Sequence, residues 1–105
     1  MPIEGGGLAL DFADGTTLTG GLFEPMRFAG EQACQGRLLA SRTRDLNVIV
    51  RRAAFAHDLA IVAPPSRLIA TDEATLIVAL AGALTVAGDT GRWRLDPDDA
   101  LRIDG

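Results

Sequence analysis

The chain of 105 residues contains no lysine, one cysteine and one histidine, and each shortage excludes a class of protein. Cys34 has no second cysteine to pair with, so an internal disulfide is excluded and a zinc site would need ligands other than thiolates. A metal centre of several imidazoles is excluded too, because His57 stands alone and Asp58 beside it would face the opposite side of a strand. The sequence therefore predicts neither a metal site nor a cofactor.

Long basic and long apolar segments are also missing. The ten arginines are scattered in a chain of formal net charge −4, so no face or arm offers the basic footprint that nucleic acids require. The N-terminal residues include no basic segment, and their apolar run breaks at Asp11, unlike a signal peptide or a membrane span. We expect a soluble cytoplasmic protein without nucleic-acid or membrane partners.

Small apolar side chains are abundant instead. Apolar residues make up 48% of the chain and aromatic residues 5%, a composition typical of an ordinary soluble domain. A chain of this length should form one domain, residues 1–105, that buries roughly two-thirds of its unfolded surface.

Alternating apolar and polar residues predict short strands along most of the chain. Residues 8–12 alternate in this way, and Asp14-Gly15 after them is typical of a hairpin turn. Further turns are expected at residues 88–91 and 97–99, and a loop containing Cys34 at residues 30–36. The other expected strands are residues 16–23 (bent at Gly20-Gly21), 26–29, 37–40, 43–52, 55–61, 72–81, 84–86, 93–95 and 101–103.

The stretch Asp72–Ala81 admits two interpretations. Asp72 and Glu73 before an alanine and a leucine suit a capped helix, whereas the continuous run Leu76-Ile77-Val78 bounded by Gly82 suits a buried strand, which we favour. About ten short strands separated by turn signals then predict an all-β sandwich or barrel.

The stretch Thr43–Arg52, TRDLNVIVRR, is the candidate site. Four arginines and only Asp45 as an acid lie between residues 41 and 52, which gives a local excess of three positive charges. An arginine fork beside an amide could bind a small carboxylate, with Arg44, Asp45, Asn47 and Arg51 as the ligand-binding residues. In the structural alternative, Asp45 accepts turn amides and pairs with an arginine while Asn47 fixes a bulge.

The same stretch resembles the HutD/Ves family, whose members show Arg-Asp-(Phe or Leu)-Asn, an apolar pair and Arg-Arg at this place. The segments EGGGLALDFADG, FEPMRFAG and GALTVAGDTGRWRLDPDDALRIDG are similar to the same family. The resemblance covers nearly the whole chain but only the C-terminal half to two-thirds of a typical member, without the usual Trp-Lys-Asn-Gly-Gly-Gly segment. It implies a single cupin-like jelly-roll domain of antiparallel strands and a link to histidine utilisation.

Together these observations predict a non-enzymatic small-molecule-binding or regulatory protein, with a small carboxylate as the expected ligand. The alternative is a structural, self-associating protein without a working pocket, and an enzyme comes third, because no residue presents itself as catalytic. We also expect a homodimer. The run Leu76–Leu80 is apolar on both faces, so it needs cover on both sides, and the family resemblance implies a missing second half.

Overall fold

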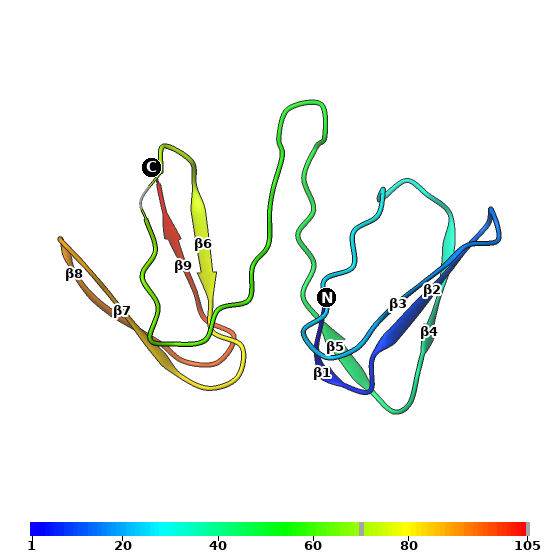
Figure 1. The fold of residues 1–105 in the computed structure, drawn as a ribbon, viewed down its shortest axis with the longest axis horizontal. Helices are drawn as coiled ribbons and strands as arrows, with labels where there is room; N and C mark the ends of the chain where they lie inside the picture. The colour runs from blue at the N-terminus through cyan, green and yellow to red at the C-terminus, as the bar shows by residue number, and fades with distance from the viewer. Residues whose placement is uncertain (70, 105) are drawn as a thin grey trace. The chain divides into compact units, whose positions relative to one another are not determined.

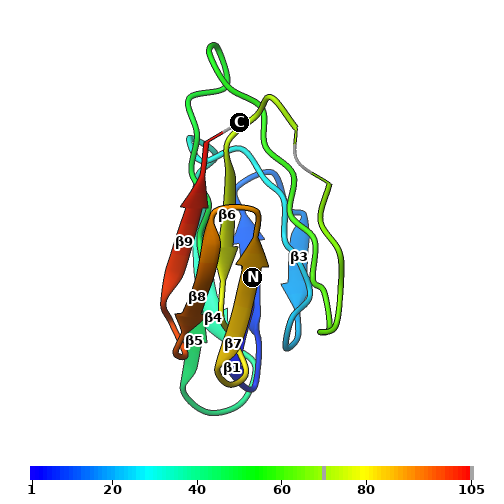
Figure 2. The same cartoon turned by 90° about the vertical axis from the view of Figure 1, so that its left-hand side faces the viewer.

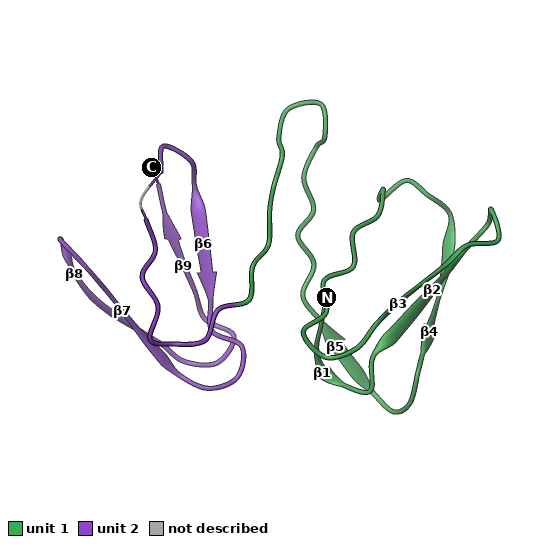
Figure 3. Cartoon of the chain, viewed as in Figure 1, with its two compact units in different colours: residues 1–61 green, residues 62–105 purple. Residues whose placement is uncertain are grey.

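The structure is a computed structural model that describes residues 1–69 and 71–104. Its regular elements are short β-strands (Figure 1). No helix occurs in this part of the chain, so none is available to span a membrane. Two compact units can be distinguished, unit 1 at residues 1–61 and unit 2 at residues 62–105 (Figure 3). The strands are β1 Pro2–Gly5, β2 Leu8–Phe12, β3 Thr17–Gly20, β4 Cys34–Leu38, β5 Thr43–Asp45, β6 Thr75–Val78, β7 Leu84–Gly88, β8 Gly91–Leu95 and β9 Ala100–Ile103.

Unit 1 contains a three-stranded antiparallel sheet with β2 at its centre. β2 pairs with β3 on one edge and with β4 on the other. The turn from β2 to β3 is the predicted Asp14-Gly15 hairpin: the Asp14 carboxylate accepts hydrogen bonds from the Thr16 amide (2.9 Å) and hydroxyl (2.6 Å). Gly15 takes a φ of +90°, a conformation that favours glycine. The hairpin prediction is confirmed.

β1 and β5 form a second, two-stranded sheet, and the chain passes from β1 to β2 through three consecutive glycines. Gly5 has a φ of +96°, and a Cβ on it would overlap the carbonyl oxygen of Arg42. A Cβ on Gly7 would lie 2.7 Å from the carbonyl oxygen of Gly20. The glycines are therefore required where the β1–β2 link crosses other backbone segments of the unit.

The core of unit 1 is small and centres on β2. Ala9, Leu10 and Phe12 are buried there, together with Met1. The Phe12 ring lies 5.9 Å from that of Phe28, centroid to centroid, in a tilted aromatic contact. Ala9 and Leu10 follow each other on a strand and so point to opposite faces of the sheet, which means that β2 buries side chains on both faces.

Unit 2 is a hairpin within a hairpin. β7 and β8 pair from Leu84↔Leu95 to Gly88↔Gly91, and β6 and β9 pair around them from Val78↔Ala100 to Thr75↔Ile103. In Figure 2, which faces this unit, the four strands lie side by side and run roughly parallel or antiparallel to one another. The predicted turn at residues 88–91 is confirmed, and the turn at residues 97–99 is closed by the Asp99 carboxylate, which accepts from the Asp96 amide at 2.9 Å.

The predicted strand at residues 43–52 is wrong beyond Asp45. β5 pairs with β1, and the last exchange joins Leu46 to Met1: the Leu46 amide donates to the Met1 carbonyl (2.9 Å) and the Met1 amino group to the Leu46 carbonyl (3.1 Å). Residues 47–50 make no backbone hydrogen bond with any described residue, so this β-forming stretch has no ladder. A turn at Arg51, whose carbonyl accepts from two later amides, then redirects the chain.

Three further strand predictions need correction. Residues 26–29 and 55–61 form no strand, because no neighbouring segment offers them a ladder of hydrogen bonds. The loop expected at residues 30–36 is wrong from Cys34, where β4 begins; all five β4 residues are exposed, so no apolar alternation marks the strand in the sequence. β1 was not predicted.

The all-β fold of short antiparallel strands is confirmed, with nine strands in the described residues where about ten were expected. The ladders within residues 1–69 and 71–104 form four separate sheets and do not close into a barrel. Asp72–Ala81 contains a strand, as favoured, but the strand is not buried as expected, since Leu76 is 65% exposed. That residues 1–105 form one domain stays a prediction.

Candidate functional site

The candidate site is a cavity of about 390 Å³ at the β1–β5 pair, lined by Glu4, Gly5, Arg42 and Arg44. The antiparallel register brings these residues together: Glu4 lies opposite Arg44, and Gly5 opposite Thr43. Alternate residues of an extended segment point to the same face, so Arg42 and Arg44 both reach the cavity across Thr43. The Thr43 hydroxyl donates to the carbonyl oxygen of Gly7 at 3.1 Å and thereby fixes the segment between the two arginines.

The charges of this cavity are one carboxylate and two guanidinium groups. Arg44 Nη1 lies 2.9 Å from Glu4 Oε2, in an ion pair whose side chains are about half exposed. An exposed pair of this kind contributes at most about 1 kcal/mol to stability. The Arg42 side chain makes no hydrogen bond or ion pair with any residue that the structure describes. The cavity therefore has a surplus positive charge and one guanidinium that is available to an anion.

Of the four predicted ligand residues, Arg44 alone lines the cavity. Asp45 follows it on β5, is exposed, and makes no hydrogen bond or ion pair within the described residues, so the turn contacts of the structural alternative are not formed there. Asn47 and Arg51 are exposed and lie beyond the end of β5, outside the cavity lining. Whether these residues bind a ligand stays a prediction.

Arg42 and Glu4 are the site residues that the sequence reasoning missed. Arg42 is two residues before Arg44, and the alternation of an extended segment would have placed both on one face. Glu4 could not have been found in this way, because its position depends on the pairing of β1 with β5, two segments about 40 residues apart. The local charge pattern identified the cationic side of the site and gave no sign of the acidic one.

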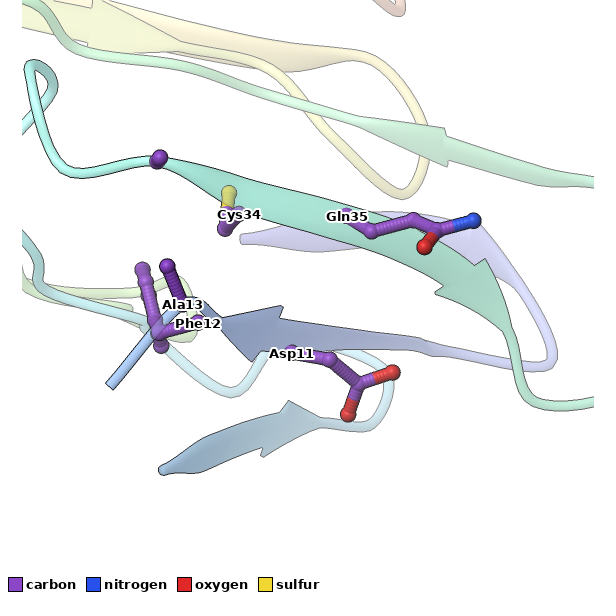
Figure 4. Close-up of a pocket in the computed structure, with 6 residues that line it drawn as sticks. Asp11, Phe12, Ala13, Cys34 and Gln35 are labelled. Atoms are coloured by element: carbon purple, nitrogen blue, oxygen red, sulfur yellow. The ribbon is translucent and has the colours of Figure 1, made fainter. Parts of the chain in front are cut away.

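A second cavity of about 410 Å³ lies beside β2 and β4 and is lined by Asp11, Phe12, Ala13, Ala33, Cys34 and Gln35 (Figure 4). Arg37 lies 3.0 Å from Asp11, and its hydrogen bonds, with a further one from Thr17, lower the pKa of the Asp11 carboxyl below its ordinary value. The Cys34 sulfur is exposed and does not point toward this carboxylate (Figure 4). Because Asp11 is ionised and engaged, it is a poor base for activating the thiol.

The remaining candidate residues show ordinary structural contacts. Asp96 pairs with Arg94 at 3.1 Å, and its amide donates to the Asp99 carboxylate in the turn before β9. The carbonyl oxygen of His57 accepts a hydrogen bond from Arg27. Among the described residues, no group of three or more histidine, cysteine, aspartate or glutamate side chains is placed to hold a metal ion.

Comparison with known proteins gives one match. A family model described as HutD matches residues 1–105. No curated protein and no solved structure gives a significant match.

Proposed function

The chain belongs to the HutD family, and we propose that it is a non-enzymatic small-molecule-binding or regulatory protein whose ligand is a small carboxylate. The observation that supports this most is the Arg42 guanidinium, which lines a cavity beside Arg44 and makes no hydrogen bond or ion pair with the described residues. A cavity of about 390 Å³ falls in the range of small-ligand sites. The link to histidine utilisation implied by the family resemblance suggests which acids to test first.

The charge balance of the cavity favours a monocarboxylate over a more highly charged anion. A planar guanidinium donates two parallel N–H groups to the two oxygens of a carboxylate, a geometry that lysine cannot reproduce. Arg42 would make this bidentate contact, and Arg44, held by Glu4, would supply a second positive charge near the ligand. The Glu4 carboxylate would repel a dianion at the same place, so the surplus charge suits a ligand of charge −1.

The cavity lining also supports a binding role rather than a catalytic one. Glu4 is the only lining residue that could accept a proton at neutral pH, and it is already paired with Arg44. Arginine stays protonated in proteins, so neither arginine serves as a base or a nucleophile. The group that we assign to the ligand, Arg42, recognises charge and shape.

A thermal-shift panel of small monocarboxylates, dicarboxylates, histidine and its breakdown products tests this proposal. A ligand that binds only the folded protein should stabilise it by about 2.7 kcal/mol at 100 times its dissociation constant. We expect monocarboxylates to raise the melting temperature more than dicarboxylates do. If no acid raises it at millimolar concentration, the carboxylate site is refuted.

Arg42→Gln and Arg92→Gln make a matched pair for the same assay. Both variants remove one exposed arginine, but Arg92 lies on β8 and lines neither cavity. We expect the thermal shift to disappear in Arg42→Gln and to persist in Arg92→Gln. Equal shifts in the two variants would place the ligand elsewhere.

The second candidate function is self-association without a ligand, and it is supported by the exposed apolar side chains. Ile49, Phe55 and Leu76 are each at least 65% exposed, and covering such side chains with a partner would remove apolar surface from water, which is favourable. We therefore propose that the protein is a homodimer, whether or not a carboxylate binds. Light scattering at micromolar concentration should give twice the chain mass of 11.0 kDa.

A further inference from the structure

The stretch that continues β5, residues 46–50, is β-forming and has an unused hydrogen-bonding edge. Leu46 directs both its N–H and its C=O toward Met1. Successive residues of an extended chain direct their backbone groups to opposite edges, so Asn47 and Ile49 direct theirs to the edge away from β1. Neither makes a backbone hydrogen bond within the described residues, although both are exposed and Ile49 is 88% exposed. An exposed edge of this kind is a template for another strand.

We infer that this edge pairs with the same segment of a second copy of the chain, antiparallel, with Val48 facing Val48 across the twofold axis. This inference names the surface of the proposed homodimer and rests on that proposal. Asn47 and Ile49 then exchange backbone hydrogen bonds with Ile49 and Asn47 of the second copy. Val48, whose backbone groups point to the other edge, occupies a non-hydrogen-bonded position, where facing side chains approach most closely.

The sequence around Val48 is complementary to itself in this register. Leu46 faces Val50 of the second copy on the same side as the two Val48 side chains, which forms a continuous apolar row. Asp45 faces Arg51 of the second copy, and the symmetry repeats this opposite-charge pair. The dimer would cover apolar side chains and give the unpaired Asp45 carboxylate a partner.

Neighbouring registers lack this match. Centring the pair on Asn47 would place Arg44 opposite Val50, and centring it on Ile49 would place Leu46 opposite Arg52. In the register centred on Val48, the one pair of like charges that face each other is Arg44 of one copy and Arg52 of the second copy. Each of these arginines already has an acid partner in its own chain, Glu4 and Glu31 respectively, which reduces the repulsion.

A charge exchange at Asp45 and Arg51 tests the pairing directly. Asp45→Arg alone and Arg51→Asp alone each turn both symmetric attractions into repulsions, and we expect either to weaken the dimer by roughly tenfold. The double variant restores opposite charges and should recover the dimer. Sedimentation or light scattering over a concentration series measures this, and a double variant as weak as the single variants would overturn the register.

Val48→Lys and Val62→Lys provide a second, matched test. Both replace a half-exposed valine outside any strand, 44% and 54% exposed respectively, but only Val48→Lys puts two ammonium groups face to face at the axis. We expect a monomer from Val48→Lys and a dimer from Val62→Lys, with circular dichroism confirming that both are folded. A dimer from both variants would refute this surface while leaving the homodimer intact. A wild-type mass near 11.0 kDa would refute the homodimer itself.

Discussion

Side-chain hydrogen bonds of unit 1 include several between residues far apart in the sequence, whereas Arg94, Asp99 and Arg102 in unit 2 use theirs on residues two or three positions away. In unit 1, Arg37 binds Asp11 from 26 residues away and Thr43 binds Gly7 from 36 residues away. In unit 2, Arg102 binds Asp104, only two residues along the chain. The long-range contacts exist only once the chain has folded, while a contact between near neighbours can form in any extended segment. Unit 1 should therefore be the more cooperative of the two.

The largest effect that we predict is on unit 1, from Gly5→Ala. The new Cβ would overlap the Arg42 carbonyl oxygen, and alanine would also have to take a φ of +96°. We expect a loss of about 3 kcal/mol or more, measured by urea unfolding followed by circular dichroism.

Gly15→Ala is the control for this variant. Gly15 has a similar φ of +90°, but nothing lies within 4 Å of the new Cβ, so only the backbone cost of about 1–2 kcal/mol remains. If the two variants lost the same stability, the close crossing of the glycine link would not be what holds unit 1 together.

A smaller difference is expected between Leu10→Ala in unit 1 and Leu95→Ala in unit 2. The two leucines are equally buried, at 7% and 6% exposure. Leucine-to-alanine changes cost about 2–5 kcal/mol, with the smaller values where the surroundings can collapse into the space. A two-stranded ladder adjusts more easily than a three-stranded sheet, so the loss of stability in Leu95→Ala should lie at the lower end of this range.

Hydrogen exchange shows whether the two units unfold separately or together. Leu95→Ala should accelerate amide exchange in β7 and β8 while leaving β2 unchanged. Uniform acceleration along the whole chain would instead mean that the units unfold together, as the single-domain prediction requires.

The smallest effect concerns the pH dependence of unit 1. Because the folded state lowers the pKa of Asp11, its contacts stabilise the protein fully above the ordinary carboxyl pKa of about 4 and are lost as the pH falls through the lowered value. Asp11→Asn should therefore lower the melting temperature at pH 7, and the difference from wild type should vanish in strong acid.

Asp72→Asn in unit 2 serves as its control, because Asp72 makes no hydrogen bond or ion pair with the described residues. We expect this variant to match wild type at both pH values. A difference for Asp11→Asn that persisted in acid would show that its cause is not the carboxylate charge.

Local chemistry explains how far the sequence could predict this structure. The turns at Asp14-Gly15 and at residues 88–91 were predictable, because their conformations depend on residues that are adjacent in the chain. The pairing of β1 with β5 was not predictable, because neither segment contains a local signal for a partner strand about 40 residues away. Val48 and Ile49 have strong β propensity, yet they form no strand because a strand also needs a ladder.

The candidate site was predictable to the same extent. The arginine-rich stretch drew attention to Arg44, and spacing alone could have added Arg42. Glu4 and Gly5 complete the cavity through strand register, which periodicity does not determine. The sequence identified which residues carry charge, whereas the structure identified which of them share a cavity.

The nested hairpins of unit 2 have a consequence for the order of folding events. β7 and β8 are joined by two residues, and such hairpins close in about 1–10 μs. Once they pair, Val78 and Ala100 are already close, so the outer ladder has only a short remaining loop to close. In unit 1, Met1 and Leu46 must meet across 45 residues before their hydrogen bonds form, which is slower. Trp93, the only tryptophan, lies on β8, so its fluorescence should report the early closure of the inner hairpin and not the later β1–β5 pairing.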